Sequence, residues 1–331
     1  MSLIPVTILT GFLGSGKTTL LNYILKQPHG HRIAVIENEF GEAGIDNELL
    51  VQDHEEQIIE MNNGCICCTV RGDLVRILGE LAAKRKAGTL NFDRVIIETT
   101  GLADPAPVAQ TFFVDEDIVQ NYMLDAIVTL VDAKHAPQQL DDHHLAQEQV
   151  GFADRILLTK TDLVDATDVV ALRQRLARIN PRAKLAESRR GVAMLGDVLD
   201  IRGFNLTAIL DIEPDFLSDV SHEHDDDITS FVFRESRPMD IEKIEDFLSA
   251  IVQVYGANLM RYKGILNIAD VDHRVVFQGV HMLMGSDLGT PWGSHEVRES
   301  KMVFIGKDMP RDVLEKGFIK SVVEACATAR T

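Results

Sequence analysis

Short hydrophobic runs alternate with amphipathic segments along the first two-thirds of the chain. Several runs are almost continuously apolar, which is typical of strands that are covered on both faces of a sheet. Between them, residues 17–26 and 73–86 place their leucines and isoleucines on one stripe at helical spacing. This alternation predicts an α/β fold with a doubly wound, mostly parallel sheet. The predicted strands are Val6–Leu9, Arg32–Ile36, Gln57–Met61, Arg94–Ile97, Ala126–Val131 and Arg155–Leu158.

The pattern changes near residue 214. Residues 214–227 are polar and end in histidines and acids, which predicts a linker. Strands mixed with two helices follow, and they predict a smaller C-terminal α+β domain at 228–331. Residues 1–213 then form the first domain. The elements predicted after the linker are strands at Ile228–Arg234, Met260–Ile268, Val275–Val280 and Lys301–Ile305, and helices at Asp240–Tyr255 and Arg311–Ala329.

The first predicted strand leads into a phosphate-binding motif. Residues 11–18 read Gly-Phe-Leu-Gly-Ser-Gly-Lys-Thr, which matches the P-loop pattern at every defined position. Backbone N–H groups of such a loop surround the β-phosphate, its lysine reaches the β- and γ-phosphates, and its Thr hydroxyl binds Mg²⁺. The sequence therefore predicts a P-loop NTPase. Its predicted nucleotide-binding residues here are Gly11, Gly14, Ser15, Gly16, Lys17, Thr18 and Thr19.

A P-loop enzyme also needs an acid at the end of another strand and a contact for the γ-phosphate. Glu98 ends an apolar run and is followed by Thr-Thr-Gly101. We expect Glu98 to hold Mg²⁺, directly or through water, and the backbone N–H of Gly101 to meet the γ-phosphate. The alternative for Glu98 is a strand-terminal carboxylate that faces water.

Thr159-Lys160-Thr161-Asp162 follows the last apolar run of the predicted sheet. A carboxylate at Asp162 can accept hydrogen bonds from N1–H and the exocyclic amine of guanine, whereas adenine would leave it unpaired. The stem of Lys160 can lie over the base. This segment therefore favours GTP and GDP over adenine nucleotides, unless it is a surface turn that caps the next helix.

Three of the four cysteines, Cys65, Cys67 and Cys68, lie within four residues. This spacing is too close for a disulfide framework. Thiolate ligands favour Zn²⁺ or Cu⁺ over Mg²⁺. In an extended backbone Cys68 would point away from the other two, so all three can converge only at a turn. The alternative is a set of small buried hydrophobic residues.

Acidic residues follow the second predicted strand, at Glu37, Glu39, Glu42 and Asp46. They can hold a cation near the cysteines, Asp46 can position the attacking water, or the segment is a solvated acidic loop. In the linker, His222 and His224 are a second candidate for metal binding, with a plain acidic linker as the alternative.

The formal net charge is −18 and the pI is about 5.0, which argues against nucleic acid or an anionic membrane as partner. No run reaches the roughly 18 to 20 apolar residues of a membrane span, and the N-terminus lacks a basic targeting region. We therefore expect a cytoplasmic protein that does not contact a membrane.

Five segments together resemble the CobW-type GTPases, relatives of the nickel-inserting GTPases HypB and UreG. They are the P-loop, the segment at Glu98, the segment that ends at Asp162, residues 38–42 and the Cys-x-Cys-Cys motif at Cys65. Residues 261–264 and 277–280 resemble the C-terminal domain of that family, so the similarity covers essentially the whole chain.

The resemblance implies slow GTP hydrolysis with Mg²⁺, and transition-metal binding at Cys65, Cys67 and Cys68 with help from Glu37 and Glu42. It implies metal trafficking, often of Zn²⁺ and sometimes of Co²⁺, and a client protein that requires the metal. It is compatible with a homo-oligomer whose assembly depends on nucleotide or metal. With only two histidines, the linker departs from many relatives and does not support metal storage there.

Two other functions remain alternatives. A P-loop kinase for a small molecule would use ATP and a lid of arginines, for which Arg189 and Arg190 are the candidates. A metal buffer or nucleotide-gated adaptor would bind the same ligands with little turnover.

Overall fold

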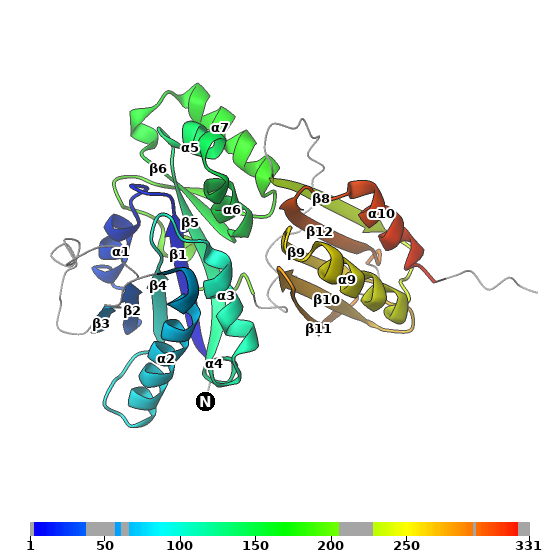
Figure 1. The fold of residues 1–331 in the computed structure, drawn as a ribbon, viewed down its shortest axis with the longest axis horizontal. Helices are drawn as coiled ribbons and strands as arrows, with labels where there is room; N and C mark the ends of the chain where they lie inside the picture. Colours follow the sequence, from blue (N-terminus) through cyan, green and yellow to red (C-terminus); the bar gives the residue numbers. More distant parts are fainter. Residues whose placement is uncertain (1–2, 38–56, 61–65, 205–227, 294–295, 324–331) are drawn as a thin grey trace, which may run out of the picture. The chain divides into compact units, whose positions relative to one another are not determined.

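The computed structural model describes residues 3–37, 57–60, 66–204, 228–293 and 296–323. These residues form two compact units, which divide between residues 204 and 228 (Figure 1). The predicted linker at 214–227 lies outside the described residues, so the predicted domain limits stay predictions. No helix of the described chain is long and apolar enough to span a membrane.

The first unit is built on a seven-stranded sheet in the order β3-β2-β4-β1-β5-β6-β7. Every neighbouring pair is parallel, which confirms the predicted fold class. The strands are β1 Ile4–Gly11, β2 Ile33–Glu37, β3 Gln57–Glu60, β4 Arg94–Glu98, β5 Tyr122–Asp132, β6 Arg155–Thr159 and β7 Lys184–Ser188. The hydrophobic pattern missed β7, because this edge strand is mostly half-exposed and polar.

Helices pack around this sheet (Figure 1). Leu20, Leu21 and Ile24 of α1 form one core with strand residues such as Leu9 and Val128. Helix α3 contacts both α2 and α6, and α3 and α6 each contact β1 and β5. The helices are α1 Lys17–Leu25, α2 Ile66–Lys86, α3 Pro105–Val114, α4 Glu116–Asn121, α5 Ala136–Asp142, α6 His144–Phe152 and α7 Ala166–Ile179.

Helix α2 begins at Ile66, seven residues before the predicted start at Asp73. The apolar stripe starts only at Leu74, and the residues before it include Gly72 and β-branched side chains with low helix propensity. Cys67 and Cys68 are therefore helical rather than extended. The geometry considered for an extended backbone therefore does not apply to Cys67 and Cys68.

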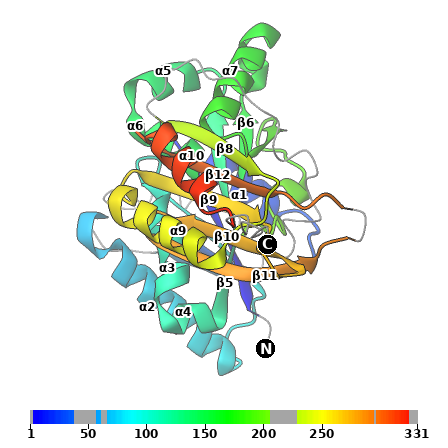
Figure 2. The same cartoon turned by 90° about the vertical axis from the view of Figure 1, so that its right-hand side faces the viewer.

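The second unit is a five-stranded antiparallel sheet in the order β11-β10-β9-β12-β8. Two helices lie across one face of it (Figure 2), where Phe233, Phe277, Phe304 and Phe318 belong to one buried core. The elements are β8 Ile228–Glu235, α9 Ile241–Tyr255, β9 Leu259–Leu266, β10 His273–Val280, β11 Leu283–Pro291, β12 Ser300–Lys307 and α10 Arg311–Lys320.

Two predictions for this unit were wrong. Strand β11 was missed, because it is an edge strand with two glycines and exposed side chains. Helix α10 ends at Lys320 instead of Ala329. The chain turns there because Ser321 accepts a hydrogen bond from the N–H of Asp240 at 2.8 Å, and Val322 forms a bridge with Met239.

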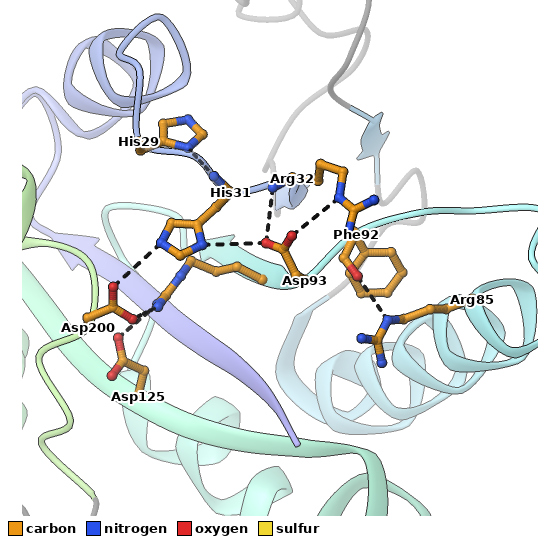
Figure 3. A network of polar contacts seen from close by, with 9 residues as sticks. His29, His31, Arg32, Arg85, Phe92, Asp93, Asp125 and Asp200 are labelled. Carbon is orange, nitrogen blue, oxygen red and sulfur yellow. Dashed lines mark hydrogen bonds and ion pairs between the residues drawn. The ribbon is translucent and has the colours of Figure 1, made fainter. Parts of the chain in front are cut away.

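A buried ion pair fixes the amino-terminal ends of β4 and β5 (Figure 3). Nη1 of Arg94 lies 2.9 Å from Oδ2 of Asp125, and both side chains are almost fully buried. Arg94 also contacts the exposed Asp200, and the other oxygen of Asp125 accepts the N–H of Arg202 at 2.8 Å. These contacts tie residues 200–202 to the sheet, at the opposite end of β4 from Glu98.

Candidate nucleotide and metal site

The predicted site residues come from strands that end at one edge of the parallel sheet. Leu9 of β1 and Glu37 of β2 both pair in register with Glu98, the last residue of β4. On the other side of β1, Thr159 ends β6 and pairs with Asp132 of β5. Ligands of open α/β sheets bind outside this carboxyl edge, so the fold brings the predicted nucleotide residues to the expected place.

The P-loop leaves β1 at Gly11 and enters α1 at Lys17. Gly11 has φ 139°, and a Cβ there would lie 2.3 Å from the carbonyl oxygen of Leu130, so no other residue fits. Gly16 caps α1 with φ 97°, and Ser15 beside it is buried. The loop therefore presents a helix N-terminus and curled backbone, which suits a phosphate group.

Lys17 is buried and folds back over this loop. Its ammonium donates to the carbonyl oxygens of Gly11 at 2.8 Å and Phe12 at 3.4 Å. Burial lowers the pKa of Lys17, and the charge of Glu98 opposes this shift. A phosphate would give the ammonium a second anionic neighbour and so favour its charged form.

Thr18 and Glu98 meet beside the loop, since the Thr18 hydroxyl donates to Oε1 of Glu98 at 2.9 Å. Octahedral Mg²⁺ with oxygen ligands at about 2.1 Å holds neighbouring ligands about 3 Å apart. The two oxygens therefore fit a shared ion or an ion-bound water. Their assignment as magnesium residues stays a prediction.

We expect Glu98→Gln to slow GTP hydrolysis by about 100-fold and to raise the Mg²⁺ concentration that half-saturates the rate. The amide keeps the size of the side chain but removes the charge that would hold the ion. Steady-state hydrolysis over a Mg²⁺ titration measures both effects. Glu116→Gln, at an exposed acid in α4, is the control, and equal Mg²⁺ curves for the two variants would contradict the assignment.

The segment after β4 continues along the P-loop. The N–H of Thr99 donates to the carbonyl of Leu9 at 3.0 Å, and Oγ1 of Thr99 donates to Oγ1 of Thr10 at 2.9 Å. A Cβ on Gly101 would lie 2.6 Å from the backbone nitrogen of Leu13. Gly101 is therefore pressed against the P-loop, where its predicted contact with the γ-phosphate requires it to be.

The base-side segment is also joined to the P-loop. Oγ1 of Thr159 donates to the carbonyl of Ser15 at 2.8 Å, and Nζ of Lys160 donates to the carbonyl of Gly14 at 2.8 Å. Lys160 takes a left-handed backbone with φ 55°, and exposed Asp162 follows in a 3₁₀ turn at Thr161–Leu163. Thr159 thus joins the base-side segment to the P-loop.

Asp132 was missed by the sequence analysis. It ends β5, is buried, and accepts Nζ of Lys160 at 2.6 Å. Burial raises the pKa of Asp132, but hydrogen bonds from Lys160, His135 and the N–H of Lys134 outweigh it and hold the pKa below its usual value. An acid directly after the predicted strand 126–131 was the signal that could have found it.

The loop after β7 completes this side. A Cβ on Gly191 would lie 2.7 Å from Cγ2 of Thr19, so residues 188–192 pack against the start of α1. Thr19, predicted to contact nucleotide, faces this loop. Arg189, a candidate for a kinase lid, forms an ion pair with Glu187 at 3.1 Å instead.

The structure describes part of the predicted transition-metal site. Glu37 is buried at the end of β2, beside Glu98, and Cys67 and Cys68 are the second and third residues of α2. Among the described residues, no three His, Cys, Asp or Glu side chains are grouped to hold a metal ion. The other predicted residues, Glu39, Glu42, Asp46, Cys65, His222 and His224, lie outside the described part of the chain.

Comparison with known proteins matches each of the two units to a protein family. Residues 5–187 match the nucleotide-binding domain of the CobW/HypB/UreG family, and residues 228–322 match the cobalamin synthesis protein cobW C-terminal domain. The zinc chaperone YjiA of Escherichia coli is 43% identical over 96% of this chain and 98% of its own length. The zinc chaperone CobW of Pseudomonas aeruginosa is 34% identical over 92% of this chain and 88% of its own length.

A solved structure agrees with these relatives. The crystal structure of Zn(II)-bound YjiA GTPase from E. coli superposes with a TM-score of 0.81 at 38% identity, over 98% of this chain and all of that chain. The match covers both units and the carboxyl-edge site. The chain therefore belongs to the CobW/HypB/UreG family of nucleotide-binding proteins.

Proposed function

We propose that this protein is a GTP-hydrolysing zinc chaperone in which the nucleotide state controls the metal site. One observation carries the proposal: Glu37, a predicted zinc ligand, pairs in register with Glu98, whose carboxylate contacts Thr18 of the P-loop. Neighbouring strands of a sheet lie about 4.8 Å apart. The two predicted ion sites would therefore share one edge of the sheet.

GTP binds with its phosphates over the P-loop. Lys17 exchanges its carbonyl partners for the β- and γ-phosphates, while Thr18 and Glu98 hold Mg²⁺. When bound, this ion neutralises charge on the β- and γ-phosphates. Gly101 contacts the γ-phosphate, and Asp46 is the proposed residue that positions the attacking water.

The base is guanine. Asp162 accepts its N1–H and amine, and Lys160, held between Gly14 and Asp132, lies over its ring. Adenine would leave the carboxylate of Asp162 unpaired. This arrangement does not favour the alternative of an ATP-dependent kinase.

Zinc is held by Cys65, Cys67 and Cys68 with Glu37 and Glu42, and Co²⁺ is an alternative cargo. The relatives named zinc chaperones support zinc. Hydrolysis changes the contacts at Glu98 and Gly101, weakens the neighbouring metal site and releases the ion to a client that requires it. We place this exchange in the cytoplasm, and self-association that depends on nucleotide or metal remains compatible with it.

Calorimetry of GTP binding in the presence of Mg²⁺, with and without one equivalent of Zn²⁺, tests the coupling. We expect zinc to change GTP affinity on the order of tenfold in the parent protein and to leave a Cys67→Ala variant unchanged. Cys326→Ala, outside the motif, is the matched control and should behave as the parent. Equal GTP affinity with and without zinc in the parent would refute the coupling and favour a GTPase whose cysteines serve another purpose.

A further inference from the structure

We propose that Gln149 is a positioning residue for residues 100–103, the Gly101 turn. It holds this turn against the P-loop and so sets the preference for GTP over GDP. The proposal rests on the proposed contact between Gly101 and the γ-phosphate. It adds a residue from a different element, helix α6, which the predicted GTPase motifs do not include.

The side chain of Gln149 joins α6 to the turn after β4. Its Nε2 donates to the carbonyl oxygens of Gly101 at 3.2 Å and Ala103 at 3.0 Å, and the residue is fully buried. Both neighbours are acceptors, so the amide nitrogen has to face them. One side chain thus fixes two carbonyls on either side of exposed Leu102.

Gln149 is itself held rigidly. Oγ1 of buried Thr129, on β5, donates to the carbonyl of Gln149 at 2.8 Å. At the end of α6, Nδ2 of Asn180 donates to the carbonyls of Val150 at 2.8 Å and Ala153 at 2.9 Å. A side chain on such a rigid helix can fix the position of the turn whose carbonyls it contacts.

The P-loop bounds the same turn from the other side. Gly101 touches the backbone of Leu13, and Thr99 is bonded to Leu9 of β1. The turn therefore lies between the P-loop and Gln149. These contacts position its backbone before nucleotide binds. Placing a donor in advance lowers the ordering cost of binding the group that it contacts.

Two buried polar atoms at the turn can still form new hydrogen bonds. Oγ1 of Thr100 and Oε1 of Gln149 are buried without a hydrogen-bond partner among the described residues. Buried polar atoms normally find partners, so a small shift of the turn can gain contacts as well as lose them. A γ-phosphate that contacts Gly101 would shift the turn and change which of these hydrogen bonds form. GDP has no group that reaches Gly101.

The test compares nucleotide affinities of Gln149→Met, which keeps the length of the side chain but removes the donor. We expect its affinity for a non-hydrolysable GTP analogue to fall about tenfold, while its GDP affinity stays within about twofold of the parent. Gln147→Met is the matched control. Gln147 is a buried glutamine of the same helix whose amide donates to the carbonyl of Leu140, in α5, at 2.8 Å, and its variant should keep the parental ratio.

The outcomes separate positioning from folding. If Gln149→Met kept the parental ratio of analogue affinity to GDP affinity, whether or not both affinities fell, the proposal would be overturned. Gly101→Ala, measured alongside, distinguishes the underlying assumption: a changed ratio in Gly101→Ala alone rejects only the role of Gln149. A parental ratio in both variants rejects Gly101 as the γ-phosphate contact.

Discussion

Asp162→Asn is expected to weaken GTP binding by about 10⁴-fold and to move the preference to xanthosine triphosphate. Guanine offers two donors, N1–H and the amine at C2, which a carboxylate accepts together. Asparagine meets the amine with its own NH₂ group and leaves donors facing each other. Xanthine carries a carbonyl at C2, which that NH₂ group can satisfy.

The geometry supports a specific effect at the base. Asp162 lies in a short turn directly after Lys160, and Lys160 is fixed to Gly14 and Asp132. Changing Asp162 leaves these anchors in place, so the phosphate site should remain formed. The variant therefore should lose the base contacts without losing the fold.

Calorimetry with GTP and with xanthosine triphosphate, each titrated directly into the protein, measures both affinities. Asp165→Asn is a matched control, because Asp165 is an exposed acid three residues further on, with no side-chain hydrogen bond to the helix that it precedes. If Asp162→Asn and Asp165→Asn bound GTP equally well, the segment would be a surface turn and not a base-recognition motif.

Arg94→Met should have the largest effect on stability, a loss of about 3–5 kcal/mol in the free energy of unfolding of the first unit. The methionine fills much of the same space but leaves the buried carboxylate of Asp125 without its cationic partner at 2.9 Å. The contact with Asp200 adds little to this estimate, because that side chain is 57% exposed and solvent screens its charge.

Two variants test the cause. Arg94→Met combined with Asp125→Asn should regain part of the loss, since no unpaired buried charge remains. Arg32→Met removes an ion pair of 3.3 Å with Asp93 at the surface and should cost less than about 1 kcal/mol. A loss of similar size in Arg32→Met and Arg94→Met would contradict burial as the reason.

The measurement has to report on the first unit. The only tryptophan, Trp292, lies in the second unit, so its fluorescence does not follow β4 and β5. Two units also make a single unfolding transition unsafe to assume. Native-state hydrogen exchange of amides in β4 and β5 under increasing urea gives the free energy where the change is made.

The two ends of β4 have different tasks. Arg94 at its start is neutralised within the core, while Glu98 at its end contacts Thr18 and faces the proposed ion sites. Residues 94–98 read Arg-Val-Ile-Ile-Glu, and the sequence analysis assigned a role only to the acid. A charged residue at the start of an apolar strand gives no sign of its partner, because Asp125 and Asp200 are distant along the chain.

The sequence by itself determined the class of the first unit and most of its strands. Continuous apolar runs can be satisfied only by a sheet covered on both faces, and the P-loop spacing from Gly11 to Thr18 fixes which strand bears phosphate. It also predicted that Glu98, Lys160 and Asp162 belong with that loop, because each follows an apolar run, and the structure joins Glu98 to Thr18 and Lys160 to Gly14. Edge strands β7 and β11 escaped it, since exposed edges carry no such hydrophobic signal.

Only the tertiary structure decided which side chains meet. It placed Thr159 against Ser15, Asp132 against Lys160, and Gln149 under the Gly101 turn, through contacts between residues far apart in sequence. Such pairs depend on strand order and register, which local hydrophobic periodicity does not encode. A parallel sheet gathers its carboxyl ends at one edge whatever the sequence distance between them, so the site is a property of the fold as much as of its motifs.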